Sequence, residues 1–499
     1  MFVKTRALNL LAGRPVAILP NEIAKWLNVH IGDRIIIRKY GEAKEITAVV
    51  DITKIEEKAE YIFVSNEILD FLRLKEGDLL EINPAPRPTS TLYIREKLDG
   101  KALSYEKLFE LMRDIVRNEL TEAEIAYFVS GSYIRGMSTE EIFNLTRAMV
   151  EVGNKLSFKE RFVLDKHCIG GIPGNRTTPI VVSIIAAAIK ELKLNAVMPK
   201  TSSRAITSAA GTADVIEQIA RVEFEPSEIM RIVNKVKACL VWGGSLGISP
   251  ADDKIIQVER FLNLDPKCQL IASIMSKKIA VGSNIVLIDI PFGPGAKVKT
   301  REEALEFKRL FELIAKKFKI KLKAVLTDGS QPIGNGIGPM LELLDVLAVL
   351  KNKPTKPIDL AEKANFIAKQ LLSLIVSKER AIKTVDKIIK NGKAYEAFKA
   401  IIKEQQGSID EKKLSPSSIF NELKAEKPGI IKAIDNRKLN LVARFAGCPV
   451  DKLAGIYLKA HLNDRVEKGE PYAIIYAETK EKLDQATTLF NEIKPIEIK

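Results

Sequence analysis

The chain contains little histidine and little cysteine. It has three histidines and four cysteines in 499 residues, and the cysteines (Cys168, Cys239, Cys268 and Cys448) show no CxxC spacing. Zinc sites are built from clustered cysteine and histidine ligands. The sequence therefore predicts no zinc site, and we expect the cysteines to be buried or free thiols in a reducing cytosol.

Long apolar runs are also missing. The longest, residues 180–189, contains Ser183 and stops well short of the ~18 residues that a membrane-spanning helix needs. Residues 1–11 already contain Lys4 and Arg6 and alternate like a strand, which does not fit a signal peptide. We therefore expect a cytoplasmic protein with no membrane partner.

The charge of the chain is basic but is not concentrated anywhere. Lys+Arg 78 and Asp+Glu 64 give a net charge of +14, which favours phosphorylated or nucleic-acid partners. Because there are no arginine-rich blocks, an anionic substrate pocket plus a solvated surface explains the charge better than a nucleic-acid groove. At this length, with 46% hydrophobic residues, three or four domains are expected.

Residues 1–83 carry an internal repeat, in which residues 16–23 match residues 61–68. Four later positions repeat with the same offset: Leu27, Gly32, Asp33 and Ile37 match Leu72, Gly77, Asp78 and Ile82. Each copy reads as strand, short helix, Gly-Asp turn and strand, and neither copy could bury its apolar face alone. The repeat predicts a pseudo-twofold β-barrel, which we interpret as an assembly or interface module. Similar half-barrels occur in DNA-binding regulators, so a basic nucleic-acid-binding regulator is the alternative from another class.

The rest of the chain reads as a series of α/β and α+β domains. Residues 84–88 form a proline-rich extended linker, and residues 89–157 form part of a helical domain with capping boxes at Thr121/Glu124 and Ser138/Glu141. Residues 158–345 alternate short apolar runs with helices, which predicts a buried parallel sheet, and part of the helical domain can be interleaved with them. Residues 346–425 are lysine-rich amphipathic helix with a weakly structured tract at 404–407, and residues 426–499 form a C-terminal α+β domain.

Two glycine-rich loops, residues 165–178 and 202–217, point to a phosphate site. Glycine lets the backbone approach an anion closely, and a helix start supplies unpaired N–H groups. Lys166 and Arg204 add positive charge. The hydroxyl donors in these loops are Thr177, Thr178, Ser202, Ser203, Ser208 and Thr212. One such loop alone would be weak evidence, because glycine more often marks a turn than a ligand.

The two loops together resemble those of the thymidine and pyrimidine nucleoside phosphorylases. The second matches the pattern S-x-R-small-apolar-x-x-small-small-G-T-x-D-x-x-E, and the first is similar to the K-H-S-x-G-G loop. Three features resemble the archaeal AMP phosphorylases in particular. They are the string Gly-Ile-Pro-Gly-Asn-Arg-Thr-Thr after the glycines, the length of the chain and the extra N-terminal domain. This resemblance covers nearly the whole chain. It implies a small helical domain that closes over a larger α/β domain, a barrel-sandwich-like C-terminal domain, no cofactor, and a homodimer or larger homo-oligomer.

The resemblance also implies a reaction and a set of site residues. AMP and inorganic phosphate would give adenine and ribose 1,5-bisphosphate, with CMP and UMP as further candidate substrates. The AMP-binding residues implied are Gly171, Ser203, Arg204, Ala205, Ile206, Thr207, Ser208, Thr212, Ser273 and Lys297, and the phosphate-binding residues are Lys166, Thr177, Thr178 and Ser202.

Asp265 is implied as the acid that protonates the departing adenine, a role that burial would favour by raising the pKa of its carboxyl group. By position alone it reads as a helix N-cap before Pro266. Ser273, four residues before Lys277 on one helical face, would likewise read as a surface residue without the resemblance.

The chain departs from the pyrimidine phosphorylases at two places. Cys168 stands where they carry serine, and Thr207-Ser208-Ala209 replaces their glycine-histidine-threonine. The lost histidine argues against ordinary pyrimidine nucleosides, although a pyrimidine-nucleoside phosphorylase is the alternative enzyme. The Gly-Thr-Gly-Gly-Asp string of the anthranilate phosphoribosyltransferases, which share a Lys and Gly-Gly loop, is absent.

Overall fold

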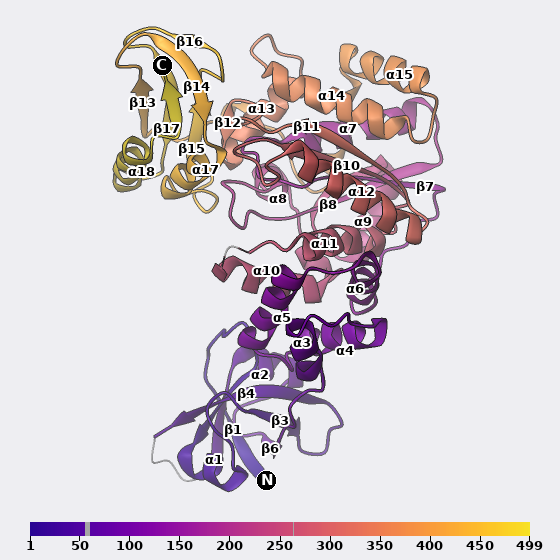
Figure 1. Cartoon of the computed structure of the whole chain (residues 1–499), viewed down its shortest axis with the longest axis vertical. Coiled ribbons are helices and arrows are strands. Elements are labelled where there is room, and N and C mark those ends of the chain that lie inside the picture. Colours follow the sequence, from indigo (N-terminus) through magenta and orange to yellow (C-terminus); the bar gives the residue numbers. More distant parts are fainter. Residues whose placement is uncertain (55–59, 263) are drawn as a thin grey trace. The chain divides into compact units, whose positions relative to one another are not determined.

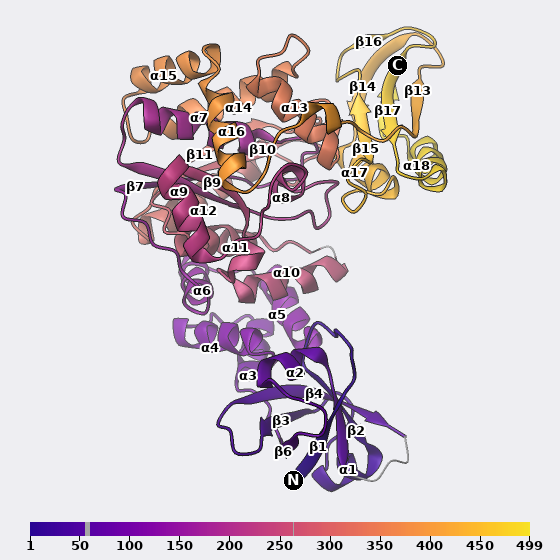
Figure 2. The same cartoon turned by 180° about the vertical axis from the view of Figure 1, so that it is seen from behind.

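The structure is a computed structural model that describes residues 1–54, 60–262 and 264–499. The chain divides into two units that are interleaved in sequence (Figures 1 and 2). The first unit comprises Met1–Gly153 and Ser249–Ser273, and the second comprises Asn154–Ile248 and Ile274–Lys499. No helix in these described ranges is long and apolar enough to cross a membrane.

The first unit begins with a closed six-stranded barrel in the order β1-β5-β2-β4-β3-β6. Its elements are β1 (Phe2–Ala7), β2 (Val16–Pro20), α1 (Asn21–Leu27), β3 (Arg34–Lys39), β4 (Glu45–Thr53), β5 (Tyr61–Val64), α2 (Asn66–Leu72) and β6 (Leu79–Pro84). Strand β1 pairs in parallel with β5, and β2 pairs in parallel with β4, as a pseudo-twofold arrangement requires. The barrel that the internal repeat predicts is confirmed.

The Gly-Asp turn in each half of the barrel is stabilised by the same kind of hydrogen bond. In each copy an aspartate carboxylate accepts a hydrogen bond from the backbone N–H three residues earlier: Asp33 from His30 (2.7 Å) and Asp78 from Lys75 (2.8 Å). Strand β6 extends into the proline-rich segment, because Pro84 still pairs with Ile35.

A bundle of helices completes the first unit. Its members are α3 (Ser90–Leu98), α4 (Tyr105–Val116), α5 (Glu122–Arg135), α6 (Thr139–Glu151), α10 (Pro250–Leu262) and the first part of α11 (Lys267–Ala280). Both predicted capping boxes are present, at the starts of α5 and α6. Helix α10 packs Ala251 and Ile255 into the same core as Leu108 of α4. Its Lys254 donates to the terminal carbonyls of α4, so a segment distant in sequence closes the bundle.

A five-stranded parallel sheet in the order β11-β10-β7-β8-β9 forms the centre of the second unit. Its strands are β7 (Phe162–Cys168), β8 (Ala196–Ser202), β9 (Ala238–Trp242), β10 (Ile285–Phe292) and β11 (Lys321–Asp328). The helices around it are α7 (Thr177–Glu191), α8 (Thr212–Ile216), α9 (Pro226–Val236), α12 (Arg301–Lys317), α13 (Pro339–Leu350), α14 (Ile358–Leu372), α15 (Lys378–Lys390) and α16 (Lys393–Glu404), with short 3₁₀ turns at Gly244–Leu246 and Glu411–Lys413. The predicted buried parallel sheet is confirmed.

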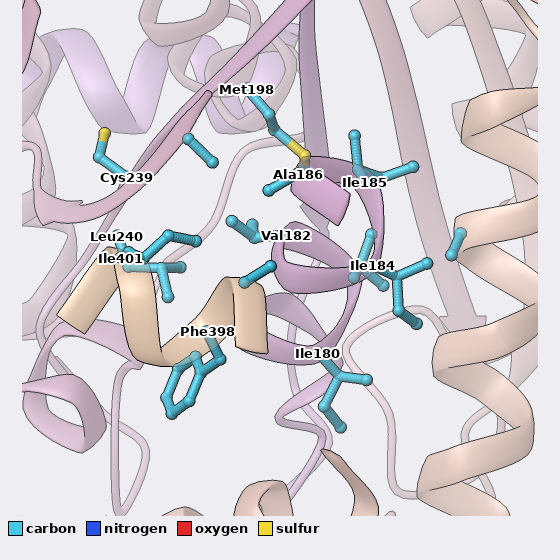
Figure 3. Close-up of a cluster of buried hydrophobic side chains, with 14 of the residues drawn as sticks. Ile180, Val182, Ile184, Ile185, Ala186, Met198, Cys239, Leu240, Phe398 and Ile401 are labelled. Atoms are coloured by element: carbon cyan, nitrogen blue, oxygen red, sulfur yellow. The ribbon is translucent and has the colours of Figure 1, made fainter. Parts of the chain in front are cut away.

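Helix α7 is buried on nearly all sides. Figure 3 shows Val182 and Ala186 of α7 beside Met198 of β8, Leu240 of β9 and Phe398 of α16. A helix that is apolar all round is a core helix rather than an amphipathic surface helix. Its first two residues, Thr177 and Thr178, are buried as well.

The C-terminal part of the second unit contains two small sheets. Its elements are β13 (Phe420–Lys424), β14 (Gly429–Ile434), α17 (Asn436–Phe445), β15 (Gly455–Leu458), β16 (Arg465–Val466), β17 (Pro471–Tyr476), α18 (Lys480–Ile493) and β18 (Ile496–Ile498). The sheet orders are β12-β15-β17-β13 and β16-β14-β18. Because β12 (Gly336–Ile337) comes from the loop after β11, the central and C-terminal parts share a sheet.

The tract 404–407, expected to be weakly structured, is tightly packed instead. Gln405 is fully buried, and its amide donates to the carbonyls of Leu240 and Arg221, both at 2.9 Å. Its Oε1 accepts from the N–H of Leu240 at 2.8 Å. Because β9 is the edge strand of the sheet, this side chain satisfies backbone groups that would otherwise be unpaired.

Replacing Gln405 by Ala is expected to lower the free energy of unfolding by about 2–4 kcal/mol, because it leaves buried backbone groups of β9 without partners. The control is Gln406→Asn, since Gln406 is exposed and its φ of 61° suits asparagine. Thermal and urea unfolding of both variants measures the difference. Equal unfolding midpoints for the two variants would contradict the role assigned to Gln405.

Candidate active site

Lys166, at the carboxyl end of β7, is the centre of a buried donor cluster. Its side chain is fully buried, and its Nζ donates to the hydroxyl oxygens of Thr177 (2.8 Å) and Thr178 (3.3 Å). These two threonines are the first residues of α7. Because each hydroxyl accepts from Lys166, its own hydrogen remains available to another acceptor. The structure thus brings together three of the four predicted phosphate-binding residues.

The electrostatics of this cluster favour an anion. Complete burial lowers the pKa of the Lys166 ammonium, while the nearby carboxylate of Asp289 opposes that shift. The N-terminus of α7 adds the positive end of a helix dipole beside the threonine hydroxyls. A bound anion would restore the interactions that Lys166 loses on leaving water.

Ser202, the fourth predicted phosphate-binding residue, ends the neighbouring strand β8. Its Oγ is shielded from solvent and has no hydrogen-bond partner among the described residues. Buried hydroxyls are nearly always hydrogen-bonded in proteins. The Ser202 hydroxyl is therefore available to a ligand at the same edge of the sheet, where open α/β sheets bind ligands.

Cys168, which replaces a serine, is inert here. Burial raises the pKa of its thiol to about 11, so the thiol stays neutral at physiological pH. Asn175 donates to its sulfur at 3.3 Å. The thiol therefore contributes neither charge nor a strong donor to an anion.

Arg204, expected to bind AMP, forms ion pairs with carboxylates in and beside its own loop. Its guanidinium donates to both carboxylate oxygens of Glu217 at 2.7 Å and to Glu223 at 2.8 Å, and it lies over the ring of Trp242. The hydrogen bonds that Arg204 donates to Glu217 raise the pKa of its guanidinium above the ordinary value. Arg204 thus fixes the shape of the loop that carries the other predicted AMP-binding residues.

Asp214 and helix α17 hold the backbone of the same loop. The carboxylate of Asp214 accepts from the N–H of Ala205 at 2.7 Å. Arg444 donates to the carbonyl of Ile206 at 2.9 Å, and Asn440 accepts from the N–H of Ala209 at 3.0 Å. These α17 contacts could not be predicted from the sequence, since neither residue belongs to a motif. Ser203 and Thr207 remain exposed, and the Ser208 hydroxyl donates to the carbonyl of Ala210 at 3.1 Å.

Thr212 is tied to the first glycine-rich loop by Arg176. The guanidinium of Arg176 donates to the hydroxyl of Thr212 (2.9 Å), to the carbonyl of Ala210 (2.9 Å) and to buried Glu342 (2.5 Å). Arg176 lies in the Asn-Arg-Thr-Thr segment but was not predicted as a site residue. It fastens the two glycine-rich loops together.

Gly171 and Lys297 are brought into close contact. Gly171 has φ of +88°, and a Cβ placed on it would lie 2.6 Å from the backbone nitrogen of Lys297. Only glycine allows the loop after β10 to approach so closely. The exposed side chain of Lys297 therefore starts directly beside the first glycine-rich loop.

Replacing Gly171 by Ala is expected to lower kcat/KM by about 10²-fold, because the loop that carries Lys297 must move by roughly 1 Å. Gly170→Ala is the matched control. Gly170 also has a positive φ, +98°, but a Cβ there would meet nothing within 4 Å. Steady-state kinetics on both variants separates the clash from the backbone strain, and equal losses would show that the close contact with Lys297 is unimportant.

Asp265 and Ser273 belong to the first unit, whereas the other predicted site residues belong to the second. Asp265 is half-buried and directly precedes Pro266, whose carbonyl accepts from the N–H of Leu270 at 2.9 Å. Pro266 therefore takes the N-cap position of α11, and the N-cap interpretation does not account for Asp265. The hydroxyl of Ser273 donates to buried Asp252 at 2.7 Å.

No metal site accompanies these residues in the described ranges. Across residues 1–54, 60–262 and 264–499, no group of three or more His, Cys, Asp or Glu side chains is arranged to hold a metal ion.

Three family models match successive parts of the chain. Residues 91–153 match the helical bundle domain of a glycosyl transferase family, and residues 160–395 match its α/β domain. Residues 430–497 match the C-terminal domain of pyrimidine nucleoside phosphorylases. The AMP phosphorylase of Thermofilum pendens is 40% identical over 99% of this chain and 95% of its own length. The chain belongs to the thymidine and pyrimidine nucleoside phosphorylase family.

Other members of this phosphorylase family are similar to the chain over most of its length. The AMP phosphorylase of Thermococcus kodakarensis is 40% identical over 100% of this chain and 98% of its own length. A putative thymidine phosphorylase of Legionella pneumophila is 42% identical over 87% of this chain and 82% of its own length. The predicted resemblance is therefore confirmed. The anthranilate phosphoribosyltransferase of Thermus thermophilus has a similar fold, with a TM-score of 0.52 and 17% identity over 63% of this chain and 99% of its own.

Proposed function

We propose that this protein catalyses the phosphorolysis of AMP, giving adenine and ribose 1,5-bisphosphate. The buried Lys166 ammonium, which supports two threonine hydroxyls at the start of α7, carries the proposal. Such a cluster has a physical use if an anion binds there. Relatives of this length and similarity that bear the name AMP phosphorylase support the choice of substrate.

The reaction exchanges one bond at C1′ of the ribose for another. An oxygen of inorganic phosphate forms a bond to C1′ while the bond from C1′ to N9 of adenine breaks. Positive charge develops on the sugar, and electron density moves onto the leaving base. Lys166, Thr177, Thr178 and Ser202 hold the phosphate in place for this attack, and positioning of both reactants supplies much of the acceleration.

Asp265 is the proposed general acid. Its protonated carboxyl group donates to N7 of adenine as the C1′–N9 bond breaks, so that the base leaves as neutral adenine. Ser273 of the first unit and Lys297 of the second are further residues proposed to bind the nucleotide. Asp252, which accepts the Ser273 hydroxyl at 2.7 Å, orients that hydroxyl.

The loop from Ser203 to Ser208, with Gly171 and Thr212, is proposed to bind the nucleotide. The ion pairs of Arg204, the hydrogen bond from Ala205 to Asp214 and the contacts from α17 all fix this backbone before a ligand arrives. Preorganisation of this kind lowers the entropy lost on binding.

Phosphate-dependent base release from AMP, CMP, UMP, adenosine and thymidine tests the proposal. We expect adenine from AMP, little base from either nucleoside, and none when phosphate is omitted. Turnover of thymidine with AMP inert would replace the proposal by a pyrimidine-nucleoside phosphorylase. The absence of any phosphate-dependent turnover would reject phosphorolysis.

A further inference from the structure

Lys363 on α14 and Asp289 on β10 form a buried ion pair, and neither residue belongs to the two glycine-rich loops. Their Nζ and Oδ2 atoms lie 3.4 Å apart, with side chains that are 8% and 0% exposed. Neither atom has a hydrogen-bond partner among the described residues. The other oxygen of Asp289 accepts from the hydroxyl of Thr327 at 2.6 Å.

Two buried charges with unused hydrogen-bonding capacity are costly for a fold. Buried ionic groups are stabilising only when their remaining protons and lone pairs are also satisfied. The Lys363–Asp289 pair fails that condition, so folding stability alone does not account for it. A bound group that accepts a hydrogen bond from Lys363 and donates one to Asp289 would account for the pair.

The charges of Lys363 and Asp289 lie close enough to Lys166 to shift its pKa. Asp289 is the register partner of Cys168 on the adjacent strand β7, two residues beyond Lys166. Because alternate residues of a strand share a face, Lys166, Cys168 and Asp289 lie on one face of the sheet. Burial alone would raise the pKa of the Asp289 carboxyl group. The nearby ammonium groups of Lys363 and Lys166 outweigh burial and bring the pKa below its ordinary value, so the carboxylate is ionised.

We propose that Lys363 is a second ammonium of the phosphate site, oriented by Asp289, and that it donates to the attacking phosphate. This inference rests on the proposed function. Hydrogen phosphate carries negatively charged oxygens and one O–H group, so it offers an acceptor to Lys363 and a donor to Asp289. These are the two kinds of partner that the pair lacks.

Binding of inorganic phosphate to the full chain, at constant ionic strength and without nucleotide, tests this role. Lys363→Gln is expected to weaken phosphate binding at least about tenfold, because one charged hydrogen bond is lost. In turnover, the KM for phosphate should rise by a similar factor while the KM for AMP stays nearly unchanged. A purely structural role would lower the unfolding temperature without separating the two KM values.

Lys369→Gln is the matched control, because Lys369 lies on the same helix and pairs with Asp386 at 2.6 Å. It should leave phosphate affinity unchanged. Asp289→Asn is a second, isosteric test. It removes the negative charge that orients Lys363 and leaves one acceptor oxygen where Asp289 offers two, one of which accepts from Thr327, so it should also weaken phosphate binding about tenfold. Unchanged phosphate affinity in a folded Lys363→Gln or Asp289→Asn protein would overturn the inference.

The binding assay separates this inference from the proposed reaction. If Lys363→Gln weakens phosphate binding but the unaltered protein releases no adenine from AMP, the phosphate site stands and the proposed reaction fails. If AMP phosphorolysis proceeds normally and Lys363→Gln binds phosphate like the unaltered protein, the reaction stands and Lys363 has no place in the site.

Discussion

Replacing Asp265 by Asn is expected to reduce kcat/KM for AMP on the order of 10²- to 10⁴-fold, the contribution of a well-placed general acid. The amide has the size of the carboxyl group but cannot release a proton to N7 of adenine. Asparagine keeps the size and shape of the aspartate side chain, so the variant should fold like the unaltered protein. Steady-state kinetics with thermal unfolding as a companion measurement checks both expectations.

AMP methylated at N7 provides the control for this variant. Its base already carries a positive charge and leaves without protonation, so it does not need the acid. We expect Asp265→Asn and the unaltered protein to cleave it at similar rates. An equal loss on AMP and on the methylated nucleotide would show that Asp265 acts in binding or folding rather than as the acid.

Replacing Lys166 by Met is expected to lower kcat/KM for phosphate on the order of 10³-fold, since preorganised charged donors contribute effects of this size. The same change should leave the unfolding temperature equal to or above that of the unaltered protein. Methionine fills much of the same volume and removes the cost of burying an ammonium. Kinetics at varied phosphate concentration and thermal unfolding in phosphate-free buffer measure the two effects.

Lys200→Met is the matched control for Lys166→Met. Lys200 is also buried, on the neighbouring strand β8, and pairs with buried Asp165 at 3.4 Å. Its loss should change the KM for phosphate little, and it should change stability little as well, because Asp165 keeps its closer ion pair with buried Lys278 at 2.7 Å. A Lys166→Met protein that is less stable but binds phosphate normally would make Lys166 a structural residue.

The parts of the fold that follow from local patterns could be predicted from the sequence. The repeat at the N-terminus predicts the barrel because each half needs the other to bury its apolar face. The capping boxes at Thr121 and Ser138 are local side-chain chemistry and are present as expected. Lys166, Thr177 and Thr178 lie within thirteen residues of one another, and they meet at the start of α7.

The parts that depend on distant partners could not be predicted. Gln405 looks like a residue of a loose polar tract, yet it satisfies the backbone of β9. Lys363 is one of many lysines in an amphipathic region, and only the packing of α14 against β10 brings it to Asp289. Arg204 shows the converse, because a motif arginine that suggests a ligand contact pairs instead with Glu217. For Gln405 and Lys363 the partner is set by tertiary packing, which leaves no local pattern in the sequence, whereas Glu217 lies in the same loop as Arg204.

Incubation with ³²P-labelled inorganic phosphate and AMP, followed by separation of the products, tests the central claim most directly. The account predicts one labelled phosphate on C1′ of ribose 1,5-bisphosphate for each adenine released. Adenine release with no label in the sugar product would identify hydrolysis and contradict the assignment of Lys166, Thr177 and Thr178 to the attacking phosphate.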